Sequence, residues 1–216
     1  RKTLKNDEIY HVDNPNKNTG NIDNLTFKYG SKLGKLIPLC KQILQNPNNK
    51  IIIFSQWDRL LNMIASILKE NDIPNLFCKG NVYQRSNAIL SFRKKLEEKK
   101  TKRKSKKSNN HARVIMLSTE HAASGTNLTE ATHVIFMDPV NGTKEEIKSI
   151  EDQAVGRAVR IGQVNQVKSI RLITKNTLEE VIFKKTHDSS TIPNIDIVPT
   201  DYTNNSQETL NNITVI

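Results

Sequence analysis

Short runs of apolar residues alternate along the chain with stretches in which apolar residues recur at helical spacing. The runs lie at 51–54, 76–78, 114–117, 134–137 and 169–173. Such runs are typical of strands buried on both faces of a parallel sheet. The helical stretches lie at 31–46, 60–68, 84–92, 145–160 and 177–185. Ser31 is a candidate N-cap of the first helix, and Pro38 predicts a kink or a later start. The pattern predicts one α/β domain, a three-layer, doubly wound parallel sheet covered by helices on both faces.

Polar stretches flank and interrupt this pattern. Residues 1–30 are rich in Asn and lack a sustained period, so we expect a linker or the end of a preceding region. Residues 31–187 form the predicted domain, with an insertion at 93–112, and residues 188–216 form a predicted polar tail. Because the chain starts with Arg1 rather than Met, we expect it to be a fragment of a larger protein.

Most of the formal net charge of +11 comes from the insertion. Residues 93–107 hold ten Lys or Arg and two Glu, a net charge of +8. The remainder is nearly neutral, which argues against a uniformly basic, histone-like protein. The tract is an extra DNA contact, a nuclear-import signal or a solvated insertion. It has no interleaved aromatic residues, which argues against base stacking within it.

Several classes of protein are excluded by composition. No run of about 18 apolar residues is present, which excludes a membrane-spanning helix, and the N-terminus lacks the apolar region of a secretory signal. The two cysteines, Cys40 and Cys78, are too few for a disulfide framework or a four-ligand zinc site. The five histidines show no metal-ligand spacing. We therefore expect a reduced, intracellular compartment and no metal site.

The segment Gln153 to Gln163, QAVGRAVRIGQ, carries the strongest chemical signal. On a helix, Arg157 and Arg160 are three residues apart and share a face, which Gln153 joins. A planar guanidinium suits a phosphate group, so the pair is a candidate phosphate site. The alternative is that both arginines pair on the surface with carboxylates such as Asp152.

Two further groups follow predicted strands. Ser55 and Gln56 come directly after the first strand, at the end where ligands bind in such sheets. Trp57 beside them either packs the domain or faces a ligand. Residues 125–127, Gly-Thr-Asn, offer backbone N–H groups, a hydroxyl and an amide that suit phosphate oxygens. Their alternative is an ordinary turn.

Together these stretches resemble the second motor lobe of the Swi/Snf-like superfamily two helicases. QAVGRAVRIGQ is similar to motif VI of that family, with the Arg-Ile-Gly-Gln ending of the Swi/Snf-like branch. In the same order, IIIFSQW at 51–57 resembles motif IV, Gly80 to Phe92 with Arg85 resembles the next segment, and 124–139 resembles motif V with its following strand. The resemblance covers about Ser31 to Phe183.

The resemblance implies a RecA-like fold and a role in an ATP-dependent double-stranded DNA translocase. It implies that ATP and Mg²⁺ are held mainly by an upstream lobe, because no G-x-x-x-x-G-K-[ST] is present here. Gln153, Gly125, Arg157 and Arg160 would bind ATP, and Arg160 would act with Arg157 as the arginine finger. The resemblance also suggests an isolated chain without significant ATPase activity.

The implied partners are the upstream motor lobe and duplex DNA, with no membrane. Residues Ser55, Gln56, Gly125, Thr126 and Asn127 are the expected nucleic-acid contacts. The implied location is the nucleus or another DNA-containing compartment.

The sequence also departs from the family pattern, and two alternatives remain open. His121-Ala122-Ala123 stands where the family has Ala-Gly-Gly, and Val159 replaces a His within motif VI. These changes fall on segments expected to contact nucleic acid and couple the lobes. One alternative is a lobe of an RNA- or DNA-unwinding helicase. The other is a degenerate, non-hydrolysing module whose basic tract binds nucleic acid or a partner.

Overall fold

The computed structural model describes residues 7–9, 24–94, 111–119, 127–160, 163, 166–187 and 214–215. Its helices are α1 (Asn24–Tyr29), α2 (Ser31–Leu44), α3 (Asp58–Glu70), α4 (Val82–Arg93), α5 (Lys144–Val155) and α6 (Leu178–His187). Its strands are β1 (Asp7–Ile9), β2 (Ile51–Ser55), β3 (Asn75–Phe77), β4 (Val114–Ser118), β5 (His133–Phe136), β6 (Lys168–Arg171), β7 (Thr174–Lys175) and β8 (Thr214–Val215).

One parallel sheet organises the domain. Its strand order is β1-β6-β5-β2-β4-β3, and every pairing within it is parallel. The central strand β2 pairs with β4 and β5 in register, Ile51 opposite both Val114 and His133. The five predicted strands and the α/β class are therefore confirmed. A separate antiparallel pair joins β7 to β8.

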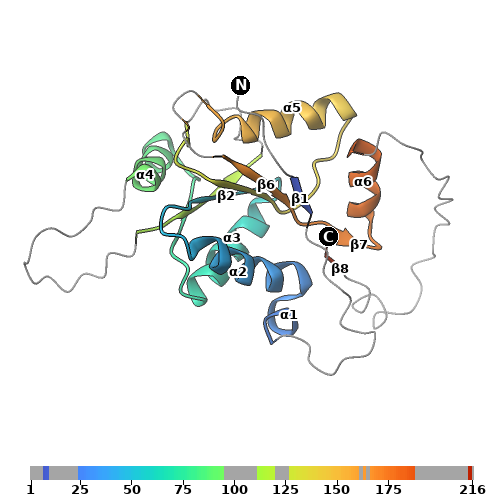
Figure 1. Cartoon of the computed structure of the whole chain (residues 1–216), viewed down its shortest axis with the longest axis horizontal. Helices are drawn as coiled ribbons and strands as arrows, with labels where there is room; N and C mark the ends of the chain where they lie inside the picture. Colours follow the sequence, from blue (N-terminus) through green and yellow to red (C-terminus); the bar gives the residue numbers. More distant parts are fainter. Residues whose placement is uncertain are drawn as a thin grey trace, which may run out of the picture.

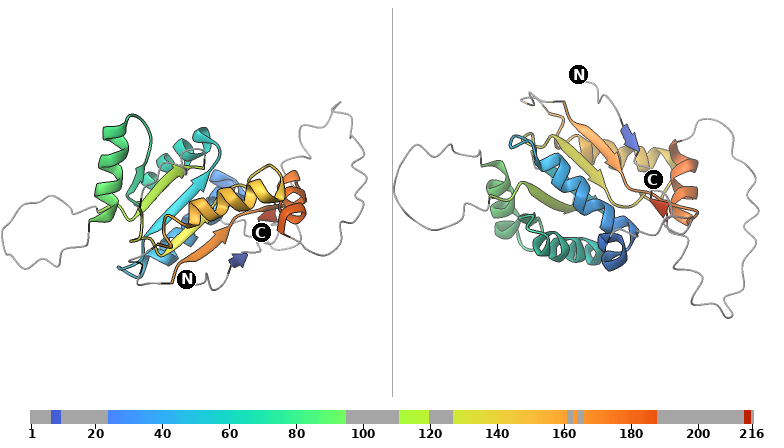
Figure 2. Two further views of the ribbon diagram at one scale, coloured as in Figure 1. Left: turned by 90° about the horizontal axis from the view of Figure 1, so that it is seen from above. Right: turned by 60° about the horizontal axis from the view of Figure 1, so that its bottom comes forward.

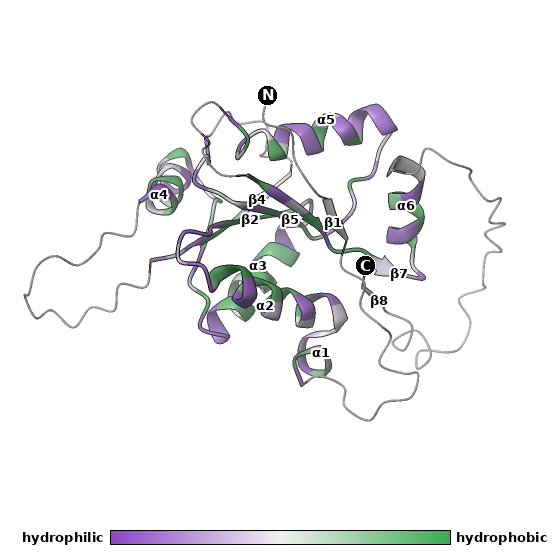
Figure 3. Ribbon diagram, viewed as in Figure 1, coloured by the Kyte–Doolittle hydropathy of each residue, from purple (hydrophilic) through white to green (hydrophobic). Residues whose placement is uncertain are grey.

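Helices cover both faces of this sheet, as Figure 1 and the two views of Figure 2 show. On one face α2 and α3 pack against alternate strand residues, including Ile51, Ile53 and Met116. On the other face α4 and α5 pack against the intervening residues, including Ile52 and Phe54. All five residues of β2 are buried, so the strand needs apolar side chains on both faces. Figure 3 shows the resulting contrast between apolar central strands and a largely hydrophilic α5.

Parts of residues 1–30, for which the sequence predicts a linker or the end of a preceding region, pack on the domain. Residues 7–9 form an edge strand beside β6, and α1 packs against α2. Gly34 allows this packing, because a Cβ built there would lie 2.6 Å from Thr26 Cα. Ser31 begins α2 but does not cap it, since Gly30 is the N-cap residue and no side-chain cap bond forms. Pro38 lies within α2 without ending it.

Lys50, which is buried, and His111 hold the two ends of the basic insertion together. Lys50 Nζ donates to the carbonyls of Phe92 and Lys94, at 2.8 Å for Lys94. His111 Nε2 lies 2.7 Å from the same Lys94 oxygen, which can only accept, so the ring donates. Burial lowers the pKa of Lys50 below its ordinary value. The insertion thus leaves and re-enters the domain at one point, next to the amino end of β2. Residues 95–110 lie outside the described residues.

Candidate functional site

The arginine segment begins where α5 ends, at Val155, which is five residues before Arg160. Regular helix stops at Val155, and Gly156 continues the chain with its N–H donating to Asp152 O at 2.8 Å. The next bonds tighten, because Arg157 N donates to Ala154 O at 3.3 Å, three residues back. A Cβ at Gly156 would lie 2.8 Å from Asp152 O, so glycine suits this close turn. The predicted shared helical face of the arginines is therefore wrong.

The two arginines consequently differ in environment. Arg157 is 6% exposed, and burial, followed by the charge of Arg160, lowers the pKa of its guanidinium. Arg160 is exposed, and its Nη1 donates to Asn127 Oδ1. The structure thus brings together a residue of the motif VI segment and one of the motif V segment, which are 33 residues apart.

Backbone contacts fix this segment beside the amino end of β5. Leu128 N donates to Arg157 O at 2.9 Å. The Gln163 amide donates to Ala131 O at 2.9 Å and to Ala158 O at 3.1 Å. Since Ala131 lies two residues before β5, helix α5 runs back along the sheet from the carboxyl to the amino ends of the strands (Figure 2). Gln163 therefore holds together the two motifs that carry Arg160 and Asn127.

Other predicted nucleotide contacts lie apart from this pair. Gln153 is exposed on α5, and its amide donates to Ser149 Oγ at 3.2 Å. Together with Glu145, Lys148 and Asp152, these two residues line a shallow, open hollow along the helix. Gly125 and Thr126 lie outside the described residues.

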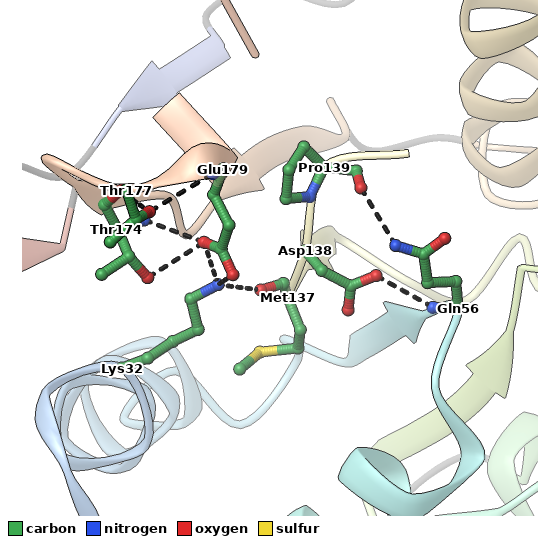
Figure 4. A network of polar contacts seen from close by, with 8 residues as sticks. All are labelled: Lys32, Gln56, Met137, Asp138, Pro139, Thr174, Thr177 and Glu179. Carbon is green, nitrogen blue, oxygen red and sulfur yellow. Dashed lines mark hydrogen bonds and ion pairs between the residues drawn. The ribbon is translucent and has the colours of Figure 1, made fainter. Parts of the chain in front are cut away.

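A second group of polar residues lies at the carboxyl edge of the sheet, between β2 and β5 (Figure 4). Gln56 N donates to Asp138 Oδ2 at 3.1 Å, and the Gln56 amide donates to Pro139 O at 3.2 Å. Ser55 is 1% exposed, and its Oγ accepts the N–H of Trp57 at 2.9 Å. Ser55 therefore holds the turn, and its side chain is not open to the predicted nucleic-acid contact. Gln56 stays partly exposed.

Asp138 is the most perturbed carboxylate of this edge. It is 8% exposed, and burial raises the pKa of its carboxyl above the ordinary value. Bonds from Ser55 and the Gln56 N–H, and the charge of Lys32, act in the opposite direction. Its Oδ1 is buried and has no hydrogen-bond partner among the described residues. Asp138 therefore clamps β5 to β2 while retaining an unsatisfied oxygen.

Lys32 and Glu179 form a neighbouring network that sequence reasoning missed (Figure 4). Lys32 Nζ donates to Met137 O at 2.7 Å and to Glu179 Oε1 at 2.7 Å. Glu179 Oε2 accepts both the N–H and the hydroxyl of Thr174 at 2.9 Å. The network joins α2, the end of β5 and α6. No pattern in the sequence could reveal it, because 147 residues separate the ionic partners.

The described residues thus present two arginines on one segment and a mixed polar and charged network at the carboxyl edge of the sheet. No group of three or more His, Cys, Asp or Glu that could hold a metal ion occurs among them. Within the same residues, no helix is long and apolar enough to cross a membrane. The donor set around Arg160 suits an anion rather than a cation.

Comparison with known proteins identifies the family. Residues 34–162 match the family model described as the helicase conserved C-terminal domain. The match covers more than half of the 216-residue chain. The chain belongs to this family. As a helicase C-terminal domain it is the second, RecA-like lobe, and its relatives are of the Swi/Snf type, as the Arg-Ile-Gly-Gln ending predicts.

The relatives of this helicase C-terminal domain are much longer proteins. It is 30% identical over 158 residues to the DNA (cytosine-5-)-methyltransferase DMT5 of Cryptococcus neoformans, covering 72% of this chain and 6% of the relative. It is 33% identical over 159 residues to the DNA repair protein RAD5 of Candida albicans, covering 71% of this chain and 13% of the relative. The crystal structure of the C-terminal part of the Fun30 ATPase domain matches with a TM-score of 0.60 and 25% identity, covering 80% of this chain and 49% of that one.

Proposed function

We propose that this helicase C-terminal domain is the second motor lobe of an ATP-dependent, Swi/Snf-like double-stranded DNA translocase. ATP and Mg²⁺ would be held mainly by an upstream lobe, across from Arg160. The observation that carries the proposal is the hydrogen bond from Arg160 to Asn127. It links the segments that resemble motifs V and VI and leaves the Arg160 side chain exposed.

The environment of Arg160 fits a phosphate. Asn127 orients the guanidinium through one nitrogen, and the nearby Arg157 adds positive charge. Arg160 forms no ion pair among the described residues, so no carboxylate there competes with an incoming anion. An arginine finger of this kind is worth about 10³–10⁵ in rate. Arg157, which is buried, would add positive charge next to Arg160. Gln153 and Gly125 are proposed as further nucleotide contacts.

The proposed nucleic-acid contacts are Gln56 and residues 125–127. Gln56 lies at the carboxyl edge of β2, and Asn127 is held by Arg160. Amide and hydroxyl groups suit sugar and phosphate oxygens, which position a motor without reading sequence. Duplex DNA is the proposed substrate because of the Swi/Snf relationship, and the nucleus is the proposed compartment.

The test is ATP hydrolysis by the parent chain that includes the upstream lobe. Rates are measured without nucleic acid and with duplex DNA, single-stranded DNA or RNA. We expect stimulation by duplex DNA, and we expect Arg160→Ala to lower the stimulated rate by about 10³ or more, with a much smaller effect on DNA affinity. Lys184→Ala is the control, because Lys184 is an exposed cation outside the basic tract that pairs with Glu180 at 2.7 Å.

Three results would contradict parts of the proposal. Stimulation mainly by RNA or single strands would indicate a strand-separating helicase. Absence of any stimulation, with intact nucleic-acid binding, would indicate a non-hydrolysing module. Steady hydrolysis by the isolated 216-residue chain that survives Arg160→Ala would refute the role of the upstream lobe.

A further inference from the structure

Two aromatic side chains project into solvent beside the carboxyl edge of the sheet. Trp57 is 60% exposed and Tyr83 is 81% exposed. Tryptophan is highly buried on average in folded proteins, so an exposed ring forfeits much of the free energy that burial would supply. Neither the family assignment nor the proposed motor role assigns a function to the Trp57 or the Tyr83 side chain.

The topology places both rings on the same rim. Trp57 comes two residues after β2 ends, and Tyr83 follows β3 in the first turn of α4. Only β4 separates these two strands, so their carboxyl ends lie about 10 Å apart. Lys79 Nζ bonds to Asp58 Oδ2 at 2.9 Å, which ties the turn after β3 to the start of α3.

The backbone that carries each ring is fixed. Trp57 N donates to Ser55 Oγ at 2.9 Å, and Trp57 O accepts from Leu61 N at 3.1 Å. Tyr83 sits within a capping box in which the side chains of Asn81 and Gln84 each accept the other's backbone N–H. Both rings are therefore presented by ordered backbone, which lowers the entropy lost when a ligand binds.

The charge around these rings is positive. Arg59 is exposed and forms no ion pair among the described residues, and Lys79 neutralises Asp58. We call Trp57, Arg59, Lys79 and Tyr83 the aromatic rim. Exposed rings beside cations are the combination that binds nucleic-acid strands through base stacking and phosphate attraction.

We propose that the aromatic rim binds a nucleic-acid strand with accessible bases, on which Trp57 and Tyr83 stack. The proposal rests on the proposed nucleic-acid role of the carboxyl edge, because the rim continues directly from Gln56. The proposed substrate of the aromatic rim is a stretch of nucleic acid with unpaired bases. This substrate class adds to the duplex contacts of the motor. Arg59, which forms no ion pair among the described residues, attracts the phosphates that lie between the stacked bases.

Trp57 is the single tryptophan of the chain, so its fluorescence reports on the rim alone. The 216-residue chain is titrated with an oligothymidylate, with a blunt duplex of equal length and with heparin. We expect quenching by the single strand and much less by the duplex. Heparin, which has no bases, should bind the basic tract without quenching. Equal quenching by all three ligands, or none by the single strand, would overturn the proposal.

Substitutions separate stacking from charge. We expect Trp57→Ala and Tyr83→Ala each to weaken single-strand affinity at least about fivefold, measured by the anisotropy of a labelled oligonucleotide. Trp57→Phe keeps a ring and should retain most affinity. The slope of log affinity against log salt should stay unchanged in all three variants, because the phosphate contacts remain.

Phe27→Ala is the matched control, since Phe27 is an 82% exposed aromatic residue on α1. Its removal should leave affinity unchanged. Equal affinity losses in Phe27→Ala and Trp57→Ala would overturn the proposal, as would a Trp57 signal that changes only when the upstream lobe is added.

The ATPase test of Arg160 and the fluorescence test of Trp57 fail independently. Loss of hydrolysis in Arg160→Ala, without quenching of Trp57 by a single strand, would support the proposed motor role and contradict strand binding by the aromatic rim. Quenching of Trp57 by a single strand, without nucleic-acid-stimulated hydrolysis, would support strand binding by the aromatic rim and contradict the proposed motor role.

Discussion

Replacing Asp138 by Asn should stabilise the domain at neutral pH. Burial raises the pKa of the Asp138 carboxyl, so the folded state binds the proton more tightly than the unfolded state does. The stabilising effect of that tighter binding is present below the ordinary pKa of 3.8 and is lost as the pH rises through the folded pKa. Asparagine carries no charge at any pH, so it escapes this loss.

The magnitude follows from the unsatisfied oxygen. Asp138 Oδ1 is buried without a hydrogen-bond partner among the described residues, and such a group costs about 1–3 kcal/mol. Asparagine can still accept the Gln56 N–H, which now lies 3.1 Å from Oδ2, but its new NH₂ group must find an acceptor. We therefore expect a net gain of about 1 kcal/mol at pH 7, which is about 2–4 °C in Tm for a domain of this size.

The assay is urea or thermal unfolding of Asp138→Asn and the unsubstituted chain between pH 4.5 and 8. The advantage of the variant should be largest at the top of this range and should shrink as the pH falls. Asp152→Asn is the control, because Asp152 is exposed and its substitution should change stability by less than about 0.5 kcal/mol. A variant that is less stable by the same amount at every pH would refute the electrostatic reasoning.

Three further substitutions test the packing and the helix ends. Gly34→Ala should displace α1, because the new Cβ would lie 2.6 Å from Thr26 Cα, and hydrogen exchange should show lost protection in α1 alone. Phe92→Ala should cost about 3–5 kcal/mol in urea unfolding, because the ring is 0% exposed in the core between α4 and the sheet. Thr143→Ala removes the capping box with Glu146 at the start of α5 and should cost about 0.5–2 kcal/mol by the same measurement.

The sheet could be predicted because its strands are buried on both faces. Each of the runs at 51–54 and 114–117 is completely buried in the structure, so its apolar composition reports directly on its position. The edge strand β1 has no such signal, since it gains its place by pairing with β6 rather than by composition. The sequence alone therefore predicts a linker or the end of a preceding region at this position.

The candidate site was predictable in its residues but not in its geometry. The motif pattern singled out Arg160 and Asn127, yet their contact is a tertiary hydrogen bond that no local pattern encodes. Helical spacing predicted one face for Arg157 and Arg160, whereas the helix ends at Val155 and leaves one arginine buried and the other exposed. The sequence position of Trp57 favours packing against the domain, and only the three-dimensional structure shows the ring in solvent.

Gln56, one of the proposed nucleic-acid contacts, lies at the opposite end of β5 from Arg160 and Asn127. At its carboxyl end, Asp138 accepts the Gln56 N–H beside the proposed strand-binding edge. At its amino end, Ala131 accepts the Gln163 amide that also holds the arginine segment. A parallel strand paired on both sides resists bending and stretching, so a displacement at either end is carried to the other. In the proposed motor, β5 and its clamps therefore offer a route from Gln56 to the arginine segment, in addition to the direct hydrogen bond between Arg160 and Asn127.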